Sequence, residues 1–200
     1  MVYIVGIGPG HKDYILPKAA EVLKNSHSII GFERAISSVD FIENNKIKVK
    51  KLSEILDIIN NAENKDISII ASGDPLFYGI TNYINKNYKG KVEIVPGISS
   101  FQYMMAKINI PWNEGFLGSL HGREEDFLNK VKEHKVSIWL TDKKHSPSYI
   151  CDILEKENIE ATIYVGENLS YEDERITKGT IKELKNKDFS ALTVVVIKKL

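Results

Sequence analysis

Residues 5–10 read Val-Gly-Ile-Gly-Pro-Gly and form a glycine-rich loop at the end of a β-rich run that spans residues 1–7. The spacing of this loop fits neither of two common phosphate-binding patterns. A dinucleotide fingerprint G-x-G-x-x-G would need its third glycine at position 11, which is His11. A P-loop would also need that glycine, and Pro9 lacks the backbone N–H that a phosphate cradle uses. The loop therefore disfavours NAD and ATP, and a tight turn without any ligand is the competing interpretation.

Two further loops follow predicted strands in the same way. The apolar run of residues 67–71 leads into Ser72-Gly73-Asp74-Pro75, and the run of residues 92–95 leads into Pro96-Gly97-Ile98-Ser99-Ser100. Helical spacing resumes after each loop, so the first half alternates strand, loop and helix, as in a mostly parallel sheet. Ligands of open α/β sheets bind beyond the carboxyl ends of the strands. The three loops could therefore meet in one crevice.

The whole chain is predicted to be an α/β protein of two domains. Residues 109–118 interrupt the rhythm of strands and helices and are interpreted as a hinge. It would separate an amino-terminal α/β domain, residues 1–110, from a carboxyl-terminal α/β domain, residues 115–200, with a mixed sheet. Ser53 is expected to be the N-cap of one helix. Ser146 is expected to be the N-cap of another, with Pro147 at its first helical position. Helices are expected over residues 17–25, 53–62, 78–87, 99–107, 124–133, 147–157 and 181–184, and strands over residues 1–7, 28–31, 67–71, 92–95, 136–140, 162–165, 175–178 and 192–197.

The composition argues against several classes of protein. The 200 residues carry 27 basic and 27 acidic side chains, and this zero net charge argues against a dedicated nucleic-acid binder. The single cysteine, Cys151, forms no internal disulfide and no cysteine zinc site, as expected in a reducing compartment. No signal peptide is supported, and the apolar run of residues 192–197 is far too short to span a bilayer. We therefore expect a cytoplasmic protein without membrane contact.

The loops also suggest the chemistry of a ligand. Asp74 supplies a carboxylate that suits a cationic or hydroxyl-rich molecule, although an Asx turn is the simpler role for this residue. Ser99 and Ser100 open a predicted helix, and the positive end of a helix suits a carboxylate. A molecule with a cationic centre, ribose hydroxyls and a free carboxylate is S-adenosylmethionine, which the loops permit but do not demand.

Five segments, taken in order, resemble the tetrapyrrole methylase family over essentially the whole chain. They read VGIGPG, SGDPLFYG, VPGISSF, SLHGR and GENLSYEDERI, at residues 5–10, 72–79, 95–101, 119–123 and 166–176. The last two are similar to the branch that methylates carbon 5 of a corrin precursor, cobalt-precorrin-7 or a precorrin-6Y type substrate. The resemblance implies two α/β domains with the active site in the cleft between them. It also implies S-adenosylmethionine-dependent C-methylation in cobalamin (vitamin B12) biosynthesis, without a protein-bound metal.

The resemblance assigns the methyl donor to residues of both domains. By position, the donor-site residues are Pro9, Gly73, Asp74, Phe77, Ser99 and Ser100, together with Leu140, Val165 and Thr193. No sharp motif fixes the last three.

The acetate and propionate groups of such a substrate need partners of their own. Only three of the 27 basic residues are arginines, so fork-shaped recognition of a carboxylate is a natural role for Arg123, and His121 is a second candidate. Pairing of Arg123 with acidic neighbours on its own helix is the competing interpretation. Glu167 is a candidate proton acceptor or hydrogen-bond partner, a purely structural carboxylate is equally compatible, and no general base is identified.

Two alternatives for the function stay open. The first is a methylase that acts at another corrin or siroheme precursor position. The second is a dinucleotide-binding oxidoreductase, against which His11 argues. The resemblance further implies a homodimer and a separate carbon-15 methylase and decarboxylase as partner, because some relatives carry that activity as a fused domain.

Overall fold

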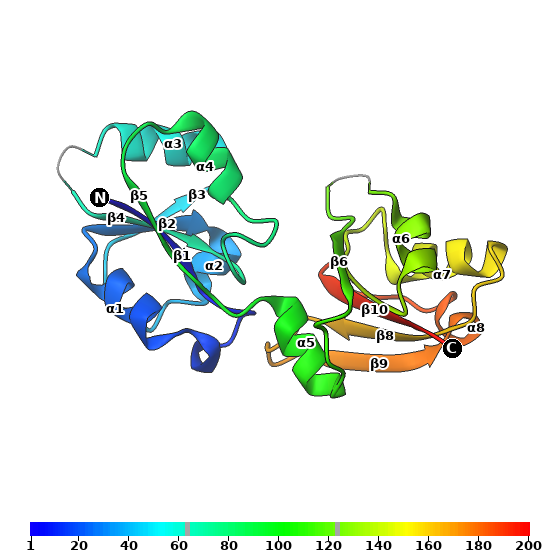
Figure 1. Ribbon diagram of the computed structural model, residues 1–200. Coiled ribbons are helices and arrows are strands. Elements are labelled where there is room, and N and C mark those ends of the chain that lie inside the picture. The colour runs from blue at the N-terminus through cyan, green and yellow to red at the C-terminus, as the bar shows by residue number, and fades with distance from the viewer. Residues whose placement is uncertain (63–64, 123–124) are drawn as a thin grey trace. The chain divides into compact units, whose positions relative to one another are not determined.

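The computed structural model describes residues 1–62, 65–122 and 125–200 (Figure 1). The chain divides into two compact units, Met1–Ser99 and Ser100–Leu200, which we call unit 1 and unit 2. Both are α/β units built around a five-stranded sheet, as predicted. In the described part of the chain, no helix has the length and apolar character that crossing a membrane requires.

All five strands of unit 1 run parallel, in the order β3-β2-β4-β1-β5. Gly6 pairs with Ala71 on one side of β1, and Val5 pairs with Val95 on the other, so three neighbouring strands end at one edge of the sheet. The strands are β1 (Val2–Gly6), β2 (Ser28–Phe32), β3 (Lys46–Val49), β4 (Ile67–Ala71) and β5 (Val92–Val95).

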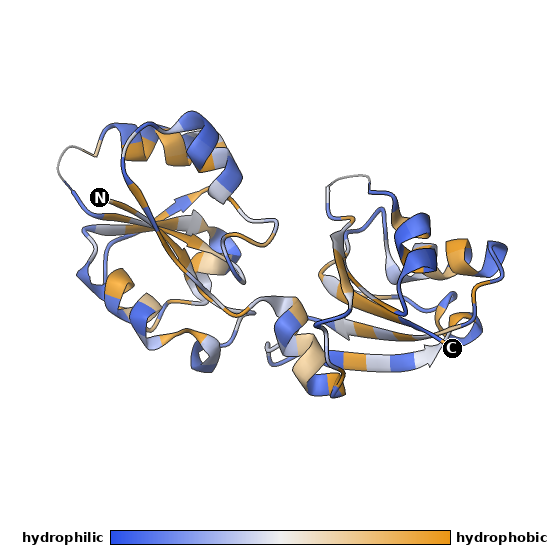
Figure 2. Cartoon of the chain, in the orientation of Figure 1, coloured by the Kyte–Doolittle hydropathy of each residue, from blue (hydrophilic) through white to orange (hydrophobic). Residues whose placement is uncertain are grey.

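Helices cover both faces of this sheet, which explains why β4 is apolar at nearly every position. The helices α1 (Pro17–Asn25) and α2 (Glu33–Ser37) pack on one face around Leu23 and Ile36. The helices α3 (Leu52–Asn60) and α4 (Thr81–Asn87) pack on the other around Ile55 and Ile84. Figure 2 shows the apolar strands inside each unit and the polar sides of the helices outside. A short 3₁₀ turn, η1 (Lys12–Tyr14), follows the first glycine loop.

Three loops at the edge of unit 1 pack backbone against backbone. A Cβ atom on Gly6 would lie 2.6 Å from the amide nitrogen of Gly97 and 2.8 Å from the carbonyl oxygen of Gly73. A Cβ atom on Gly97 would lie 2.2 Å from that same carbonyl oxygen. The Gly73 N–H donates to the Gly8 carbonyl at 2.8 Å. Glycine is required here because no side chain fits between the loops, and the predicted meeting of the three loops is confirmed.

The sheet of unit 2 is mixed, as predicted, in the order β6-β7-β10-β8-β9. The strands β6 and β7 run parallel, whereas β10 runs antiparallel to both β7 and β8, and β9 antiparallel to β8. Consequently, the carboxyl ends of β6, β7 and β8 share one edge with the first residues of β9 and β10. The strands are β6 (Phe116–Ser119), β7 (Val136–Leu140), β8 (Ala161–Glu167), β9 (Arg175–Thr180) and β10 (Thr193–Lys199).

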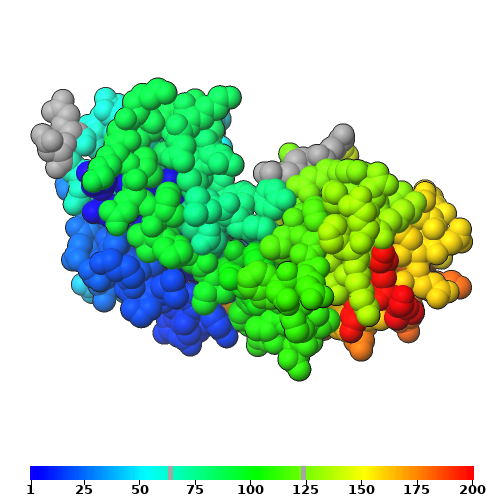
Figure 3. Space-filling model, in the orientation of Figure 1, coloured from blue at the N-terminus to red at the C-terminus, as the bar shows by residue number. Residues whose placement is uncertain are grey.

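The described residues of unit 2 also form four helices. Three of them share a core with the sheet around Trp139: α6 (Phe127–Glu133), α7 (Pro147–Lys156) and α8 (Ile181–Leu184). The fourth, α5 (Ser100–Ile108), contacts β7 and β10, and its Met104 lies against Gly166 of β8. The carboxyl-terminal end of the chain reaches the surface (red in Figure 3), and Leu200, the residue after β10, is 85% exposed.

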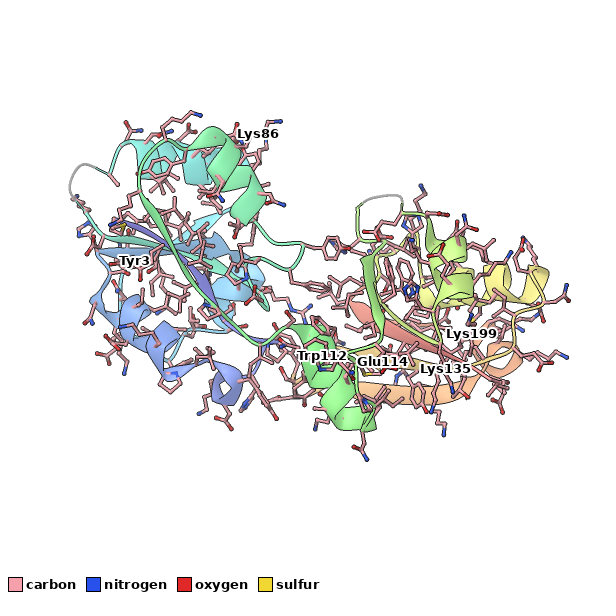
Figure 4. All side chains as sticks on the ribbon, in the orientation of Figure 1. Tyr3, Lys86, Trp112, Glu114, Lys135 and Lys199 are labelled. Carbon is pink, nitrogen blue, oxygen red and sulfur yellow. The ribbon has the colours of Figure 1, made fainter. Side chains whose placement is uncertain are left out.

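The boundary between the units differs from the expected hinge at residues 109–118. The units divide between Ser99 and Ser100 because α5 packs with unit 2, and Phe116–Ser119 form a strand instead of a linker. The segment after α5 also packs back on it, since the Trp112 ring meets the Phe101 ring edge-on with centroids 5.3 Å apart. Trp112 is labelled in Figure 4.

Two other local predictions were wrong. Ser53 lies inside α3, whose N-cap is Lys51, and the Lys50 N–H is satisfied by the Glu54 carboxylate at 3.0 Å. The helix expected from residue 78 begins at Thr81, because Tyr78 has a φ of +53°. By contrast, the predicted Ser146 cap is confirmed, since its hydroxyl accepts the Tyr149 N–H at 3.2 Å.

We expect the Gly97→Ala substitution to destabilise unit 1 by about 3 kcal/mol, because the new methyl group meets immobile backbone on two sides. Urea unfolding followed by circular dichroism measures this cost. Ser72→Ala, an exposed neighbour in the same group of loops, is the matched control and should unfold like the parent. A Gly97→Ala protein with parental stability would contradict the close packing of the loops.

Candidate functional site

The Asp74 carboxylate joins two of the three loops of unit 1. One oxygen accepts the Leu76 N–H at 2.8 Å, which is the Asx turn considered from the sequence. The other accepts the Gly97 N–H at 3.1 Å, across from the loop after β5. Each carboxylate oxygen has two lone pairs, so these bonds leave Asp74 able to accept from a ligand as well. Asp74 therefore bridges two loops and can still accept hydrogen bonds from a ligand.

The other predicted donor-site residues of this edge lie close in the chain to that bridge. Pro9 is half-buried and follows Gly8, which pairs with Gly73. The Phe77 N–H donates to the Asp74 carbonyl at 3.2 Å. Ser99 is buried two residues after Gly97, and Ser100 begins α5. Whether these residues touch a methyl donor stays a prediction.

The chemistry of this edge fits a sulfonium nucleoside better than a phosphate. Lysine and arginine are absent from the three loops, residues 6–10, 72–79 and 96–100, so nothing in them neutralises a phosphate. Pro9 has no N–H, and the N–H groups of Gly73 and Gly97 are already bonded within the protein. What the edge does present is the Asp74 carboxylate, which favours a cation and hydroxyl donors.

The predicted residues of unit 2 lie on or next to one edge of its sheet. Leu140 ends β7 and pairs with Val194, the neighbour of Thr193, which begins β10. The hydroxyls of Thr141 and Thr193 hydrogen-bond to each other, and both side chains are buried. Val165 differs from these residues, because its side chain is fully buried in the core of unit 2. Its backbone lies between β10 and β9, paired with Val195 and Thr177, so a contact of Val165 with a donor stays a prediction.

Glu167 is engaged by the protein itself. Both of its carboxylate oxygens accept from the Arg175 guanidinium, one of them at 2.8 Å, and the Ser190 N–H donates to it at 2.9 Å. Burial would raise the pKa of Glu167, but the Arg175 and Ser190 bonds outweigh it and hold that pKa below its usual value. This geometry favours the structural role of Glu167, and its part in substrate handling stays a prediction. The rare Arg175 does show fork-shaped recognition, of a carboxylate within the chain.

His121 lies on the loop after β6 and is exposed. Its Nδ1 is 3.1 Å from the Thr141 carbonyl oxygen, so a hydrogen bond there places a proton on Nδ1 and leaves Nε2 toward other partners. Arg123, the second candidate for the substrate carboxylates, lies outside the described residues. Both roles stay predictions.

Asp142 organises the loops after β6 and β7, a role that no sequence motif signalled. It accepts the Gly122 N–H at 2.8 Å and the His145 N–H at 2.7 Å. These two backbone bonds lower the pKa of Asp142 to about 2. His145 is itself buried, with Nδ1 at 3.2 Å from the Asp142 carboxylate.

The acidic run at residues 172–174 also has internal partners. Glu174 accepts the Ser170 N–H at 2.6 Å and lies 3.5 Å from Lys107 of α5. Burial, together with the neighbouring Glu174 carboxylate, raises the pKa of Tyr103 on α5 to about 12. Asn168 and Ser170 have φ values of +45° and +68°, so this loop holds two non-glycine residues in the left-handed region. Glu174 thus fixes a strained loop to α5.

Two further observations concern the reactivity of the thiol and the possibility of a metal site. Burial raises the pKa of the Cys151 thiol to about 12, so this group is unreactive at neutral pH. Among residues 1–62, 65–122 and 125–200, no three His, Cys, Asp or Glu side chains are grouped so as to hold a metal ion.

We expect Arg175→Met to destabilise unit 2 at pH 7, because it leaves the buried Glu167 charge without its cation. Without Arg175, burial raises the pKa of Glu167, so the cost should shrink as the pH is lowered and Glu167 takes up a proton. Urea unfolding at pH 7 and pH 5 measures both effects. Arg175→Lys keeps the charge but loses the two-pronged guanidinium contact, so its free energy of unfolding should lie between those of the parent and Arg175→Met. A loss of stability in Arg175→Met that does not change with pH would contradict the pairing of Arg175 with an ionised Glu167.

We expect Asp142→Asn to cost about 1–2 kcal/mol at pH 7, since an amide oxygen replaces only one of two acceptors. The native pKa of Asp142 is about 2, below its unfolded value, so the stabilisation is complete above about pH 4 and is lost as the pH falls toward 2. Unfolding curves of the two proteins should therefore converge between pH 4 and pH 2. Parallel curves over that range would show that the Asp142 charge contributes nothing.

Known proteins agree with this architecture over nearly the whole chain. A family model described as Tetrapyrrole (Corrin/Porphyrin) Methylases matches residues 1–185. A probable cobalt-precorrin-7 C(5)-methyltransferase of Methanocaldococcus jannaschii is 37% identical and aligns over 98% of this chain and 97% of its own length. A cobalt-precorrin-7 C(5)-methyltransferase of Salmonella typhimurium is 30% identical, with 98% of each chain covered.

Solved structures show the same fold. The precorrin-6Y methylase of Archaeoglobus fulgidus superposes with a TM-score of 0.80 at 22% identity, over 100% of this chain and 98% of its own. A uroporphyrin-III C-methyl transferase of Thermus thermophilus, complexed with S-adenyl homocysteine, gives a TM-score of 0.82 at 18% identity, over 98% and 91% of the two chains. The family match, the two relatives and the shared fold together show that the chain belongs to the tetrapyrrole (corrin/porphyrin) methylases.

Proposed function

We propose that this protein transfers a methyl group from S-adenosylmethionine to carbon 5 of cobalt-precorrin-7, a step in cobalamin biosynthesis. The observation that carries the proposal is the full-length similarity, at 37% and 30% identity, to two relatives that bear this activity in their names. The SLHGR and GENLSYEDERI segments, which resemble the same branch, agree with it.

The edge of unit 1 supports the choice of donor. When bound, S-adenosylmethionine supplies an activated methyl group on a sulfonium centre, so the protein needs no nucleophile of its own. Asp74 and the loop carbonyls would hold the cationic and hydroxyl-bearing parts, and the glycine contacts keep these groups rigid. The Thermus thermophilus enzyme of the same fold binds the demethylated donor, which supports this assignment.

The family resemblance also assigns residues of unit 2 to ligand binding. Leu140, Val165 and Thr193 are proposed to contact the donor, as the family resemblance implies. His121 and Arg123 are proposed to hold carboxylates of the substrate, for which His121 has its Nε2 side available. Glu167 is already paired with Arg175, so a purely positioning role suits it better than proton transfer.

The proposed function also carries expectations for cellular location, oligomeric state and partners. We propose that the protein acts in the cytoplasm as a homodimer, binds a small-molecule corrin precursor and contacts neither nucleic acid nor membrane. Carbon-15 methylation and decarboxylation would belong to a separate partner. Any cobalt would arrive inside the substrate.

We expect the purified protein to bind S-adenosylmethionine and not NAD in isothermal titration. With cobalt-precorrin-7 and a donor carrying a deuterated methyl group, mass spectrometry should show one labelled methyl on the macrocycle, located at carbon 5 by NMR. Methylation at another carbon would move the protein to another position of the pathway, and binding of NAD alone would point to an oxidoreductase.

We expect Asp74→Asn to weaken donor binding by about tenfold, because the substitution removes the charge that faces the cation. Ser72→Ala is the matched control and should bind like the parent. Both proteins are titrated well below their unfolding midpoints, since Asp74→Asn also loses one backbone acceptor. A folded Asp74→Asn protein with parental donor affinity would reduce Asp74 to its structural role.

A further inference from the structure

Tyr78 is held in a backbone conformation that aromatic residues rarely adopt. Its φ of +53° lies in the left-handed region, where a bulky side chain is strained. Glycine adopts this conformation freely, and Gly79 stands directly behind it. Strain of this kind persists only where the surroundings enforce it, and it concentrates at functional sites.

The surroundings do enforce it. At the start of the loop, the Asp74 carboxylate accepts a hydrogen bond from the Leu76 N–H, and the Asp74 carbonyl accepts one from the Phe77 N–H. At the end, the buried Thr81 hydroxyl donates to the Pro75 carbonyl at 2.8 Å. Gly79 lies so close to Pro75 that a Cβ atom would approach its carbonyl oxygen to 2.3 Å. The loop between β4 and α4 (Figure 1) is therefore closed at both ends, and Tyr78 has no relaxed alternative.

The tip of this loop is apolar. Residues 75–80 read Pro-Leu-Phe-Tyr-Gly-Ile and contain no charge. The Leu76 side chain is 67% exposed, whereas Pro75 beside it is buried. Tyr78 is half-buried and meets Phe77 edge-on, with ring centroids 4.9 Å apart and planes at 75°. Leu76 is therefore an exposed aliphatic side chain two residues before a tyrosine whose backbone is held in a strained conformation.

We propose that Leu76 and Tyr78 form the surface on which one face of the macrocyclic substrate rests, and that they help to select flat tetrapyrrole rings. This inference rests on the proposed function. A corrin precursor carries its carboxylates on the rim and exposes apolar faces, so its rim suits basic side chains and its face suits aliphatic and aromatic ones. The tip follows Asp74 directly in the chain, so it lies beside the proposed donor residues of unit 1. The loop contacts fix the position of Tyr78 before substrate binds, so binding does not have to order the loop at a cost in conformational entropy.

The test compares substitutions that separate contact from folding. Tyr78→Gly removes the ring together with its contact to Phe77, and relief of the left-handed strain offsets part of that loss, so the protein should stay folded at the assay temperature. KM for cobalt-precorrin-7 should rise roughly five- to tenfold, with Kd for S-adenosylmethionine changed by less than about twofold. Tyr78→Phe keeps the ring and should retain the parental KM. Leu76→Asn should raise KM as well, and Leu76→Met should not.

The outcomes separate this inference from the proposed function. If the parent protein fails to methylate cobalt-precorrin-7, the proposed function fails first. If the parent is active and Tyr78→Gly keeps the parental KM, the contact surface is refuted. A Tyr78→Gly protein that is unfolded at the assay temperature shows a packing role instead, and one whose mass by light scattering changes shows a subunit contact instead; either result overturns the inference.

Discussion

The close contact of Gly6, Gly73 and Gly97 is the constraint on which the rest of unit 1 depends. The carbonyl of Gly73 occupies the space that a side chain on either of the other two would need. This contact brings the ends of three parallel strands together and lets the Asp74 carboxylate reach the loop after β5. The same carboxylate then sets the turn that leads to the strained Tyr78. This one contact between backbones thus determines both the loop edge of unit 1 and the loop that carries Tyr78.

Carboxylates of unit 2 illustrate a second theme, in which acidic side chains hold loops in place. Glu167 is paired with Arg175, Asp142 accepts two backbone N–H groups, and Glu174 fixes its loop to Lys107 of α5. Because each is stabilised as an anion, none is poised as a base near neutral pH. This is compatible with a reaction whose methyl donor is already activated, where the protein mainly aligns the reactants and excludes water.

Much of the fold follows from local sequence patterns. Continuous apolar runs predicted β4 and β7 at their observed bounds, and the Ser146-Pro147 pair predicted the start of α7. The short β3 was missed because its four residues, Lys-Ile-Lys-Val, are too few for their alternation to stand out, and it lies at the edge of the sheet, paired with β2. β6 was missed for a related reason, since Gly118 reads as a breaker yet leaves room for the Trp139 ring.

The site was less accessible to sequence reasoning than the fold. Asp74 and its loops were visible because each loop follows a strand directly. The partners of Glu167 and Asp142 were not, since Ser190 and Gly122 donate through backbone N–H groups that carry no residue-type signature. The left-handed Tyr78 was equally hidden, because its conformation is imposed by Asp74, Gly79 and Thr81 together.

Both tryptophans of the chain, Trp112 and Trp139, belong to unit 2. Intrinsic indole fluorescence is therefore an optical reporter of one half of the molecule. Circular dichroism responds to both halves, so a mismatch between the two signals during denaturation would reveal whether the halves melt together or one after the other.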